Sequence, residues 1–205
     1  MMDPWVLLAF VPAALALNLT PGADMMFCLG QGLRGGPREA MAASAGISLG
    51  SLVHVTLAAL GLGALVAAVP WLFDVIRWIG VAYLMWLAQG ALRAGPMRAK
   101  GRPMSAGRAF REGLVVNLTN PKVIFFVLAF LPQFVDPARA LLPQFMVFGA
   151  ILGFGGLVIN GAVGVFAGSL GRLVAGSERF NRGLGIASAG IFTALALRLA
   201  ILERA

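Results

Sequence analysis

Cysteine and histidine are almost absent from this chain of 205 residues, which contains one of each, Cys28 and His54. A membrane carrier of reducing equivalents needs a pair of thiols for disulfide exchange, and a thiolate-based metal exporter needs several, so a single cysteine excludes both classes. One histidine excludes a His-Glu-x-x-His metal site, and no glycine-rich phosphate loop follows a strand-like run. We therefore expect no enzyme activity, no metal site and no cofactor, and we interpret Cys28 as a small packing residue.

Charged residues are also scarce. They make up 12% of the chain, whereas 60% of the residues are hydrophobic and the mean hydropathy is +0.89. An average soluble domain has roughly 25% charged residues. A soluble fold of 21.4 kDa has too little interior to hide so much apolar surface. The sequence therefore predicts an all-α integral membrane protein that is surrounded by the lipid bilayer.

Six hydrophobic runs are long enough to cross a membrane, for which about 20 apolar residues suffice. They are Pro4–Leu33, Glu39–Val69, Trp71–Leu92, Arg108–Val135, Leu141–Gly168 and Arg182–Ile201. We do not expect the first run to be a cleaved signal peptide, because Asp3 stands where a positive charge is usual and the run continues past Asn18.

The distribution of cations predicts the orientation. If the amino terminus lies outside, the segments after the first, third and fifth runs are cytoplasmic and hold eleven of the sixteen Lys and Arg residues. This bias predicts a multi-pass protein of a bacterial-type inner (plasma) membrane with both termini outside. Segment 94–107 is then a basic cytoplasmic linker between the halves 1–93 and 108–205. The net charge of +8 does not indicate a nucleic-acid partner, because the basic stretch 93–111 has a single aromatic residue, Phe110.

Two of the runs are interrupted by nearly the same polar string. The strings read Asn18-Leu19-Thr20-Pro21-Gly22 and Asn117-Leu118-Thr119-Asn120-Pro121-Lys122. Because Pro favours the first helical position and Thr or Asn caps free amides, we expect helices one and four to be broken at Pro21 and Pro121, each distal segment starting at its proline. With three helices per half, the second half is threaded in the opposite direction. Broken helices in corresponding positions of two inverted-topology three-helix repeats point to a transporter with a substrate site at the midplane.

Two ionisable residues lie deep in the predicted membrane. Asp24 lies ten residues before Arg34, and Lys122 lies eleven residues after Arg111, which places both about 15 Å from the cytoplasmic boundary. Such residues usually mark substrate or ion paths, although the two could instead neutralise each other as a buried pair. The helix amino termini at the breaks favour an anion. A zwitterionic amino acid would then place its carboxylate against these amides or Lys122, and its ammonium near Asp24.

The candidate substrate-binding residues are those of the two breaks and the two charges: Asn18, Pro21, Gly22, Asp24, Asn117, Asn120, Pro121 and Lys122. Asn18 and Asn117 either contact substrate or only cap the broken helices. Asp24 and His54 are candidates for proton or ion coupling, although a lone membrane histidine more often bonds a neighbouring helix. Asn160 is a weaker pathway candidate.

The second run carries a stripe of polar side chains and pairs of small residues. The stripe consists of Ser44, Ser48, Ser51 and His54 and is expected to face inward. The small-residue pairs are Gly46/Gly50 in the second run and Gly149/Gly153 and Gly164/Gly168 in the fifth. These pairs predict close helix packing, and they also permit a homodimer, although packing within the bundle uses the same faces.

Taken together, these motifs resemble the LysE/RhtB family of amino-acid and metabolite exporters, in which helix one carries Asn-x-x-Pro-Gly-Pro-(Asp/Asn) and helix four carries Asn-x-x-Asn-Pro-Lys. Three further stretches of this chain look like the family: Ala45–Gly50 with His54, Gly80–Leu84, and Phe130–Val135. The likeness runs from Asn18 to about Ala200. One departure is Ala23, which stands where the family commonly has a second proline and would soften the first break.

The resemblance implies secondary active export of amino acids or related small amine-bearing metabolites from the cytoplasm, driven by a proton or sodium gradient. Asp24 is the single acidic residue deep in the predicted membrane, which favours a neutral substrate over a dicationic one. Two alternatives stay open. The chain could be a passive channel or accessory membrane subunit, or a cation efflux protein of the same fold, although the latter needs more hard oxygen ligands than the sequence offers.

Overall fold

The computed structural model describes residues 4–68, 71–93, 104–136, 138–167 and 177–201. Most of the predicted linker 94–107, and Gly168 of the predicted small-residue pairs, lie outside these ranges. The elements are α1 (Pro4–Leu19), α2 (Ala23–Arg34), α3 (Pro37–Ala68), α4 (Leu72–Arg93), α5 (Ala106–Leu118), α6 (Pro121–Phe125), η1 (Phe126–Phe130, a π-helical turn), η2 (Leu131–Phe134, a 3-10 turn), α7 (Leu141–Val165) and α9 (Glu178–Ile201). The secondary structure of the described ranges is therefore helical throughout, as the composition predicts.

Three helices are long and apolar enough to cross a membrane within the described ranges. They are Pro37–Gly61 of α3, Leu141–Val165 of α7 and Arg182–Ile201 of α9. Two bent pairs, α1 with α2 and α5 with α6 to η2, bring the number to five if each pair forms one span. The helix α4 is not among the candidate spans found within the described residues. The six-span inverted repeat therefore stays a prediction.

The first bent pair breaks at the predicted string. The helix α1 ends at Leu19, and both the amide and the hydroxyl of Thr20 donate to the carbonyl oxygen of Ala16, at 2.9 and 2.5 Å. The next helix begins at Ala23 with Gly22 as its cap, and the two axes differ by 53°. The break is thus confirmed.

The second bent pair uses the same threonine chemistry. The amide and hydroxyl of Thr119 donate to the carbonyl oxygen of Val115, at 3.0 and 2.9 Å. Asn120 then caps α6, because its Oδ1 accepts the amide of Lys122 at 3.0 Å, and Pro121 occupies the first helical position. The bend is 52°. This break is confirmed, and its distal segment starts at the proline as predicted.

One prediction about the first break is wrong, since α2 starts at Ala23 and not at Pro21. The second string has one residue more, Asn120, between its threonine and its proline. In both strings the threonine is bonded back into the preceding helix, so only the second string retains a side chain that can cap a helix beginning at proline. Pro21 therefore lies in the connection between α1 and α2.

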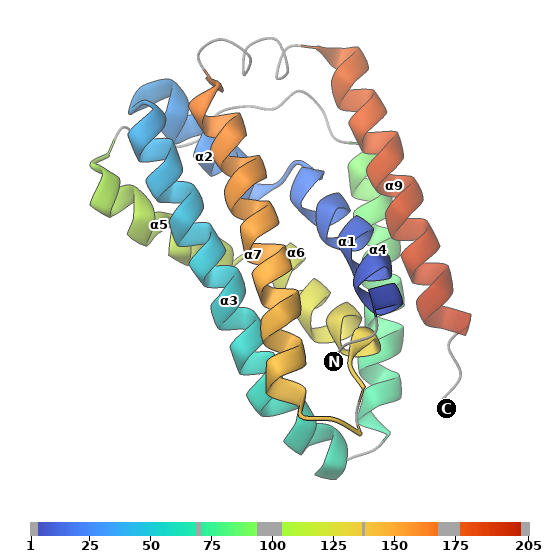
Figure 1. Cartoon of the computed structure of the whole chain (residues 1–205). Helices are drawn as coiled ribbons and strands as arrows, with labels where there is room; N and C mark the ends of the chain where they lie inside the picture. The colour runs from blue at the N-terminus through green and yellow to red at the C-terminus, as the bar shows by residue number, and fades with distance from the viewer. Residues whose placement is uncertain (1–3, 69–70, 94–103, 137, 168–176, 202–205) are drawn as a thin grey trace.

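The helices pack in two groups joined by the broken elements. The helix α3 packs against α5 and α7, and α4 packs against α9. Figure 1 shows α1 between α7 and α9, and both of these helices contact it. Phe10 of α1 is fully buried at the centre of the apolar core, with its ring centroid 4.6 Å from that of Phe148 and 5.3 Å from that of Phe134. Aromatic packing thus joins the broken elements of the two halves to α7.

Small residues set the closest helix approaches, as the sequence predicts. A Cβ atom built on Gly46 of α3 would overlap the carbonyl oxygen of Phe110 on α5, and one built on Gly113 of α5 would overlap that of Ala43 on α3. Gly149 and Gly153 of α7 face α3, and Gly164 faces α2 and α3. These small faces are therefore used within the bundle, while the expected homodimer stays a prediction.

The polar stripe of α3 faces inward and binds neighbouring helices. The Ser44 hydroxyl donates to the carbonyl oxygen of Leu157 at 2.9 Å, and that of Ser48 to Gly153 at 2.8 Å, so both attach α3 to α7. The His54 Nε2 atom lies 3.2 Å from the carbonyl oxygen of Asn117 at the end of α5. The stripe thus fixes α3 against both α7 and the second break.

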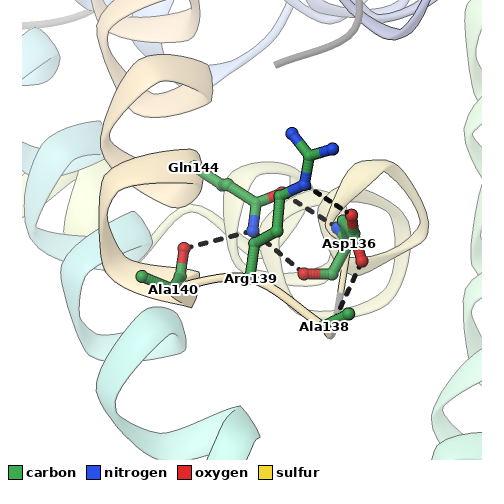
Figure 2. A network of polar contacts seen from close by, with 5 residues as sticks. All are labelled: Asp136, Ala138, Arg139, Ala140 and Gln144. Carbon is green, nitrogen blue, oxygen red and sulfur yellow. Dashed lines mark hydrogen bonds and ion pairs between the residues drawn. The ribbon is translucent and has the colours of Figure 1, made fainter. Parts of the chain in front are cut away.

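A single glutamine closes the turn between η2 and α7 (Figure 2). Gln144 accepts the amide of Asp136 at 2.9 Å and donates to the carbonyl oxygens of Asp136 and Ala140, at 3.0 and 3.1 Å. The Asp136 carboxylate in turn accepts the Ala138 amide and pairs with Arg139, both at 2.9 Å. These bonds replace regular helix capping and anchor the end of the second broken element on α7.

Candidate substrate site

The two breaks bind each other through their side chains. Asn117, the last but one residue of α5, donates from Nδ2 to Oδ2 of Asp24 in the first turn of α2, at 2.9 Å. Lys122, in the first turn of α6, donates from Nζ to the carbonyl oxygens of Leu17 and Thr20 at the end of α1, at 2.8 and 2.9 Å. The second half therefore supplies two side chains, which bond groups of the first half on either side of its break.

Lys122 performs the capping that the first break requires. The last carbonyl groups of a helix have no intrahelical partner and carry a partial negative charge. A cation placed there can donate hydrogen bonds to these carbonyl oxygens and also interacts favourably with their partial negative charge. Gly22 leaves room for it, because a Cβ atom on Gly22 would lie 3.2 Å from the Lys122 Nζ. Lys122 is thus bound to the backbone of the opposite half.

Asp24 and Lys122 do not form a direct ion pair. The ion pairs of the described residues that reach within 4.0 Å join Arg77 with Asp74, Arg108 with Glu112, and Arg139 with Asp136. The buried pair that the sequence allowed as an alternative therefore has no direct contact between its two charges. Lys122 bonds backbone carbonyls and Asp24 bonds an amide, although the two charges lie within electrostatic range of each other.

Asp24 keeps part of its bonding capacity free. Its side chain is buried, and Oδ1 has no hydrogen-bond partner among the described residues. Asp24 lies in the first turn of α2, close to the partial positive charge of the helix amino terminus. A buried carboxylate oxygen that lacks a donor is an attractive position for a cationic group of a ligand.

The two asparagines of the breaks do not cap their own helices. The Asn18 Nδ2 donates to the carbonyl oxygen of Leu152 on α7 at 3.1 Å. Asn117 is fully buried and uses Nδ2 for Asp24, while its carbonyl oxygen bonds His54. Capping at the breaks is done instead by the threonines, Lys122 and Asn120, within the part of the chain that the structure describes.

A small pocket lies where α1, α2, α3, α6 and α7 meet. Its polar lining consists of Asn18, Asp24, Ser51, Lys122 and Asn160. Its apolar lining consists of Leu17, Ile47, Val123, Leu152 and Gly156. The centre of a water-sized molecule has ≈ 10 Å³ available in it, which is room for about one small polar group.

Three of the eight predicted substrate residues line this pocket, namely Asn18, Asp24 and Lys122. Gly22 and Asn117 lie one contact away, against Lys122 and Asp24, while Pro21, Asn120 and Pro121 shape the breaks. His54 does not line the pocket and reaches it only through Asn117. No three His, Cys, Asp or Glu side chains of the described ranges gather closely enough to hold a metal ion.

Three residues of α7 line the pocket, of which only Asn160 was a candidate from sequence. Leu152, Gly156 and Asn160 are spaced by four residues and form one stripe of this helix. Because α7 is apolar on most of its surface, its sequence does not indicate which face points inward. The one available signal was Asn160, a polar residue in the middle of an apolar run.

The sequence profile of the family described as LysE type translocator matches residues 15–203. An uncharacterized membrane protein of Vibrio cholerae is 39% identical over 151 residues, which cover 72% of this chain and 74% of that protein. The homoserine/homoserine lactone efflux protein of Salmonella typhimurium is 34% identical over 144 residues, covering 69% of this chain and 70% of that protein. The leucine efflux protein of Klebsiella pneumoniae is 35% identical over 135 residues, 63% of each chain. No solved structure matches the chain.

Proposed function

The chain belongs to the LysE type translocator family, and on that premise we propose that it is a secondary active exporter of amino acids or related small amine-bearing metabolites. Relatives whose names state homoserine and leucine efflux support an exporter. The main structural support for a substrate site at this position is the pocket between the two breaks, which is lined by both Asp24 and Lys122.

The polar groups of the pocket match a zwitterion. The free Oδ1 of Asp24 would accept the substrate ammonium. Lys122 has three N–H donors, of which two are bonded to Leu17 and Thr20, so the third would bind the carboxylate. The amide of Lys122 is already bonded to Asn120. We therefore assign the carboxylate to the Lys122 side chain and not to the amides that follow Pro121.

The lining also bears on substrate class. Asp24 is the one acidic residue of the pocket, and Leu17, Ile47, Val123 and Leu152 surround it with aliphatic surface. A second cationic group on the substrate would find no second carboxylate in this lining, and its charge would have to be buried without a counter-charge. We therefore propose that the substrate has a neutral side chain.

Transport requires the pocket to enlarge, because a whole amino acid does not fit in ≈ 10 Å³. The bonds from Lys122 to α1 and from Asn117 to α2 join the two breaks, so we propose that they move together when the pocket opens toward either side of the membrane. This is the movement expected of inverted repeats around a fixed site. The six-span repeat, the inner-membrane location and the outside position of both termini are part of this proposal.

The coupling ion is proposed to bind at Asp24. A proton would neutralise its carboxylate and compete with the substrate ammonium, and a sodium ion would occupy the same free oxygen. His54 bonds the backbone of Asn117, the residue that donates to Asp24, so its protonation would act on the same group indirectly.

The test is export from proteoliposomes loaded with a mixture of amino acids, with a pH gradient, a sodium gradient or neither. Loss of one or a few neutral amino acids that is accelerated by one of the gradients supports the proposal and identifies the coupling ion. Loss at the same rate under all three conditions indicates a passive channel. Retention of every amino acid contradicts the proposal, and a cation flux from the same vesicles would indicate the cation efflux alternative.

A further inference from the structure

Asn160 is one of three polar residues of the pocket that the proposed zwitterion does not use, the others being Asn18 and Ser51. It lies on α7, its side chain is 3% exposed, and its Oδ1 has no hydrogen-bond partner among the described residues. A buried amide oxygen without a donor is costly, and native structures usually satisfy such an atom with protein, water or ligand. The Asn160 Oδ1 is therefore available to accept a hydrogen bond from a ligand.

The position of Asn160 is fixed by the way α7 is held. Asn18 bonds the carbonyl oxygen of Leu152, and Ser48 bonds that of Gly153. Ser44 bonds that of Leu157, one turn before Asn160. These bonds attach α7 to α1 and α3 and prevent rotation of the stripe that lines the pocket.

Gly156 keeps the space beside Asn160 open. A Cβ atom at position 156 would lie 3.3 Å from the Asn18 Oδ1 and 3.8 Å from the Asn160 Nδ2. Without that atom a small space remains between the Asn18 Oδ1 on α1 and the Asn160 Nδ2 on α7. Gly156 thus leaves Asn160 in contact with the pocket.

The size of the pocket limits what Asn160 can bind. The pocket has room for about one water-sized group. A primary ammonium group has that size. An ammonium carries three N–H donors, which a single carboxylate oxygen cannot satisfy. Among the described residues of the pocket lining, two fully buried side-chain oxygens lack a donor, the Asp24 Oδ1 and the Asn160 Oδ1.

We infer that Asn160 is a second ligand of the substrate ammonium, acting together with Asp24, and this inference rests on the proposed function. Asp24 supplies the charge and Asn160 supplies a neutral acceptor. Amine-bearing substrates are thereby selected over carboxylic acids that lack an amine.

The inference is tested by binding to the purified full chain in lipid nanodiscs. The probes are labelled L-leucine and L-homoserine, each competed by its analogue without the ammonium group, isocaproate and γ-hydroxybutyrate. Asn160→Leu keeps the volume but removes the acceptor, Asn160→Ala provides a second variant, and Ser188→Ala on α9 is the control because Ser188 is buried away from the pocket.

We expect either Asn160 variant to weaken binding of the amino acid about tenfold, since a hydrogen bond to a charged group is lost, and to leave competition by the analogue unchanged. The control should match the wild type. Equal weakening of amino acid and analogue would show a structural role and overturn the inference, as would unchanged binding of the amino acid. If the wild type binds neither amino acid, the proposed function fails and the inference fails with it.

Discussion

The side chain of Asn117 donates a hydrogen bond of 2.9 Å to the carboxylate of Asp24, across 93 residues of sequence. Asn117 is the last but one residue of the helix before the second break, and Asp24 is the second residue of the helix after the first. The bond therefore crosses between the halves at the points where both helices are interrupted. Lys122, which follows the second break, donates to the carbonyl oxygens of Leu17 and Thr20 before the first break, so both donors belong to the second half.

Asn117→Asp should lower the free energy of unfolding by about 2 kcal/mol, because a buried donor is replaced by a second carboxylate beside Asp24. The double variant Asp24→Asn/Asn117→Asp restores an amide and a carboxylate in exchanged places. It should recover part of the loss. Denaturant unfolding of the detergent-solubilised protein measures both values. A double variant no more stable than Asn117→Asp would show that the bond does not stabilise the fold.

Lys122→Met should destabilise the protein by about 2–3 kcal/mol, since two buried carbonyl oxygens at the end of α1 lose their donor. The matched control is Arg111→Met, which removes an exposed cation on α5 and should change stability by less than about 0.5 kcal/mol. Thermal unfolding in detergent compares the two. Equal stability of the two variants would contradict the capping role of Lys122.

Gly46→Ala should separate α3 from α5, because the new methyl group would overlap the carbonyl oxygen of Phe110, a backbone atom that cannot turn away. We expect a loss of about 2 kcal/mol in unfolding free energy. Gly61→Ala, on the same helix, is the control, since nothing lies within 4 Å of a Cβ atom there. A Gly46→Ala protein as stable as the Gly61→Ala protein would refute the close packing of these helices.

The breaks could be predicted from the sequence because their chemistry is local. Threonine and proline in a hydrophobic run interrupt a helix by steric and hydrogen-bonding rules that do not depend on the rest of the fold. The one local error, the start of α2 at Ala23, follows from a missing residue: the first string lacks a counterpart of Asn120 to cap a helix at Pro21.

The partners of the buried charges could not be predicted in the same way. Lys122 bonds two backbone carbonyls, and any residue type could supply these, so no side chain in the sequence identifies them. The opposite charge of Asp24 instead suggested a direct pair, which the structure replaces with the bond to Asn117. The role of Asn160 depends on the rotation of α7, and that rotation is fixed by bonds from Asn18, Ser44 and Ser48.

The most direct test of the account is the rate of leucine and homoserine export from proteoliposomes that contain wild type, Asp24→Asn or Asp74→Asn. Asparagine at position 24 can still accept the bond from Asn117, so the fold is retained while the charge is lost. Asp74 is the control, because it pairs with Arg77 on α4 and does not line the pocket. We expect Asp24→Asn to slow export about tenfold or more, and Asp74→Asn to export at the wild-type rate. Export by Asp24→Asn at the wild-type rate would contradict the assignment of this pocket as the substrate site.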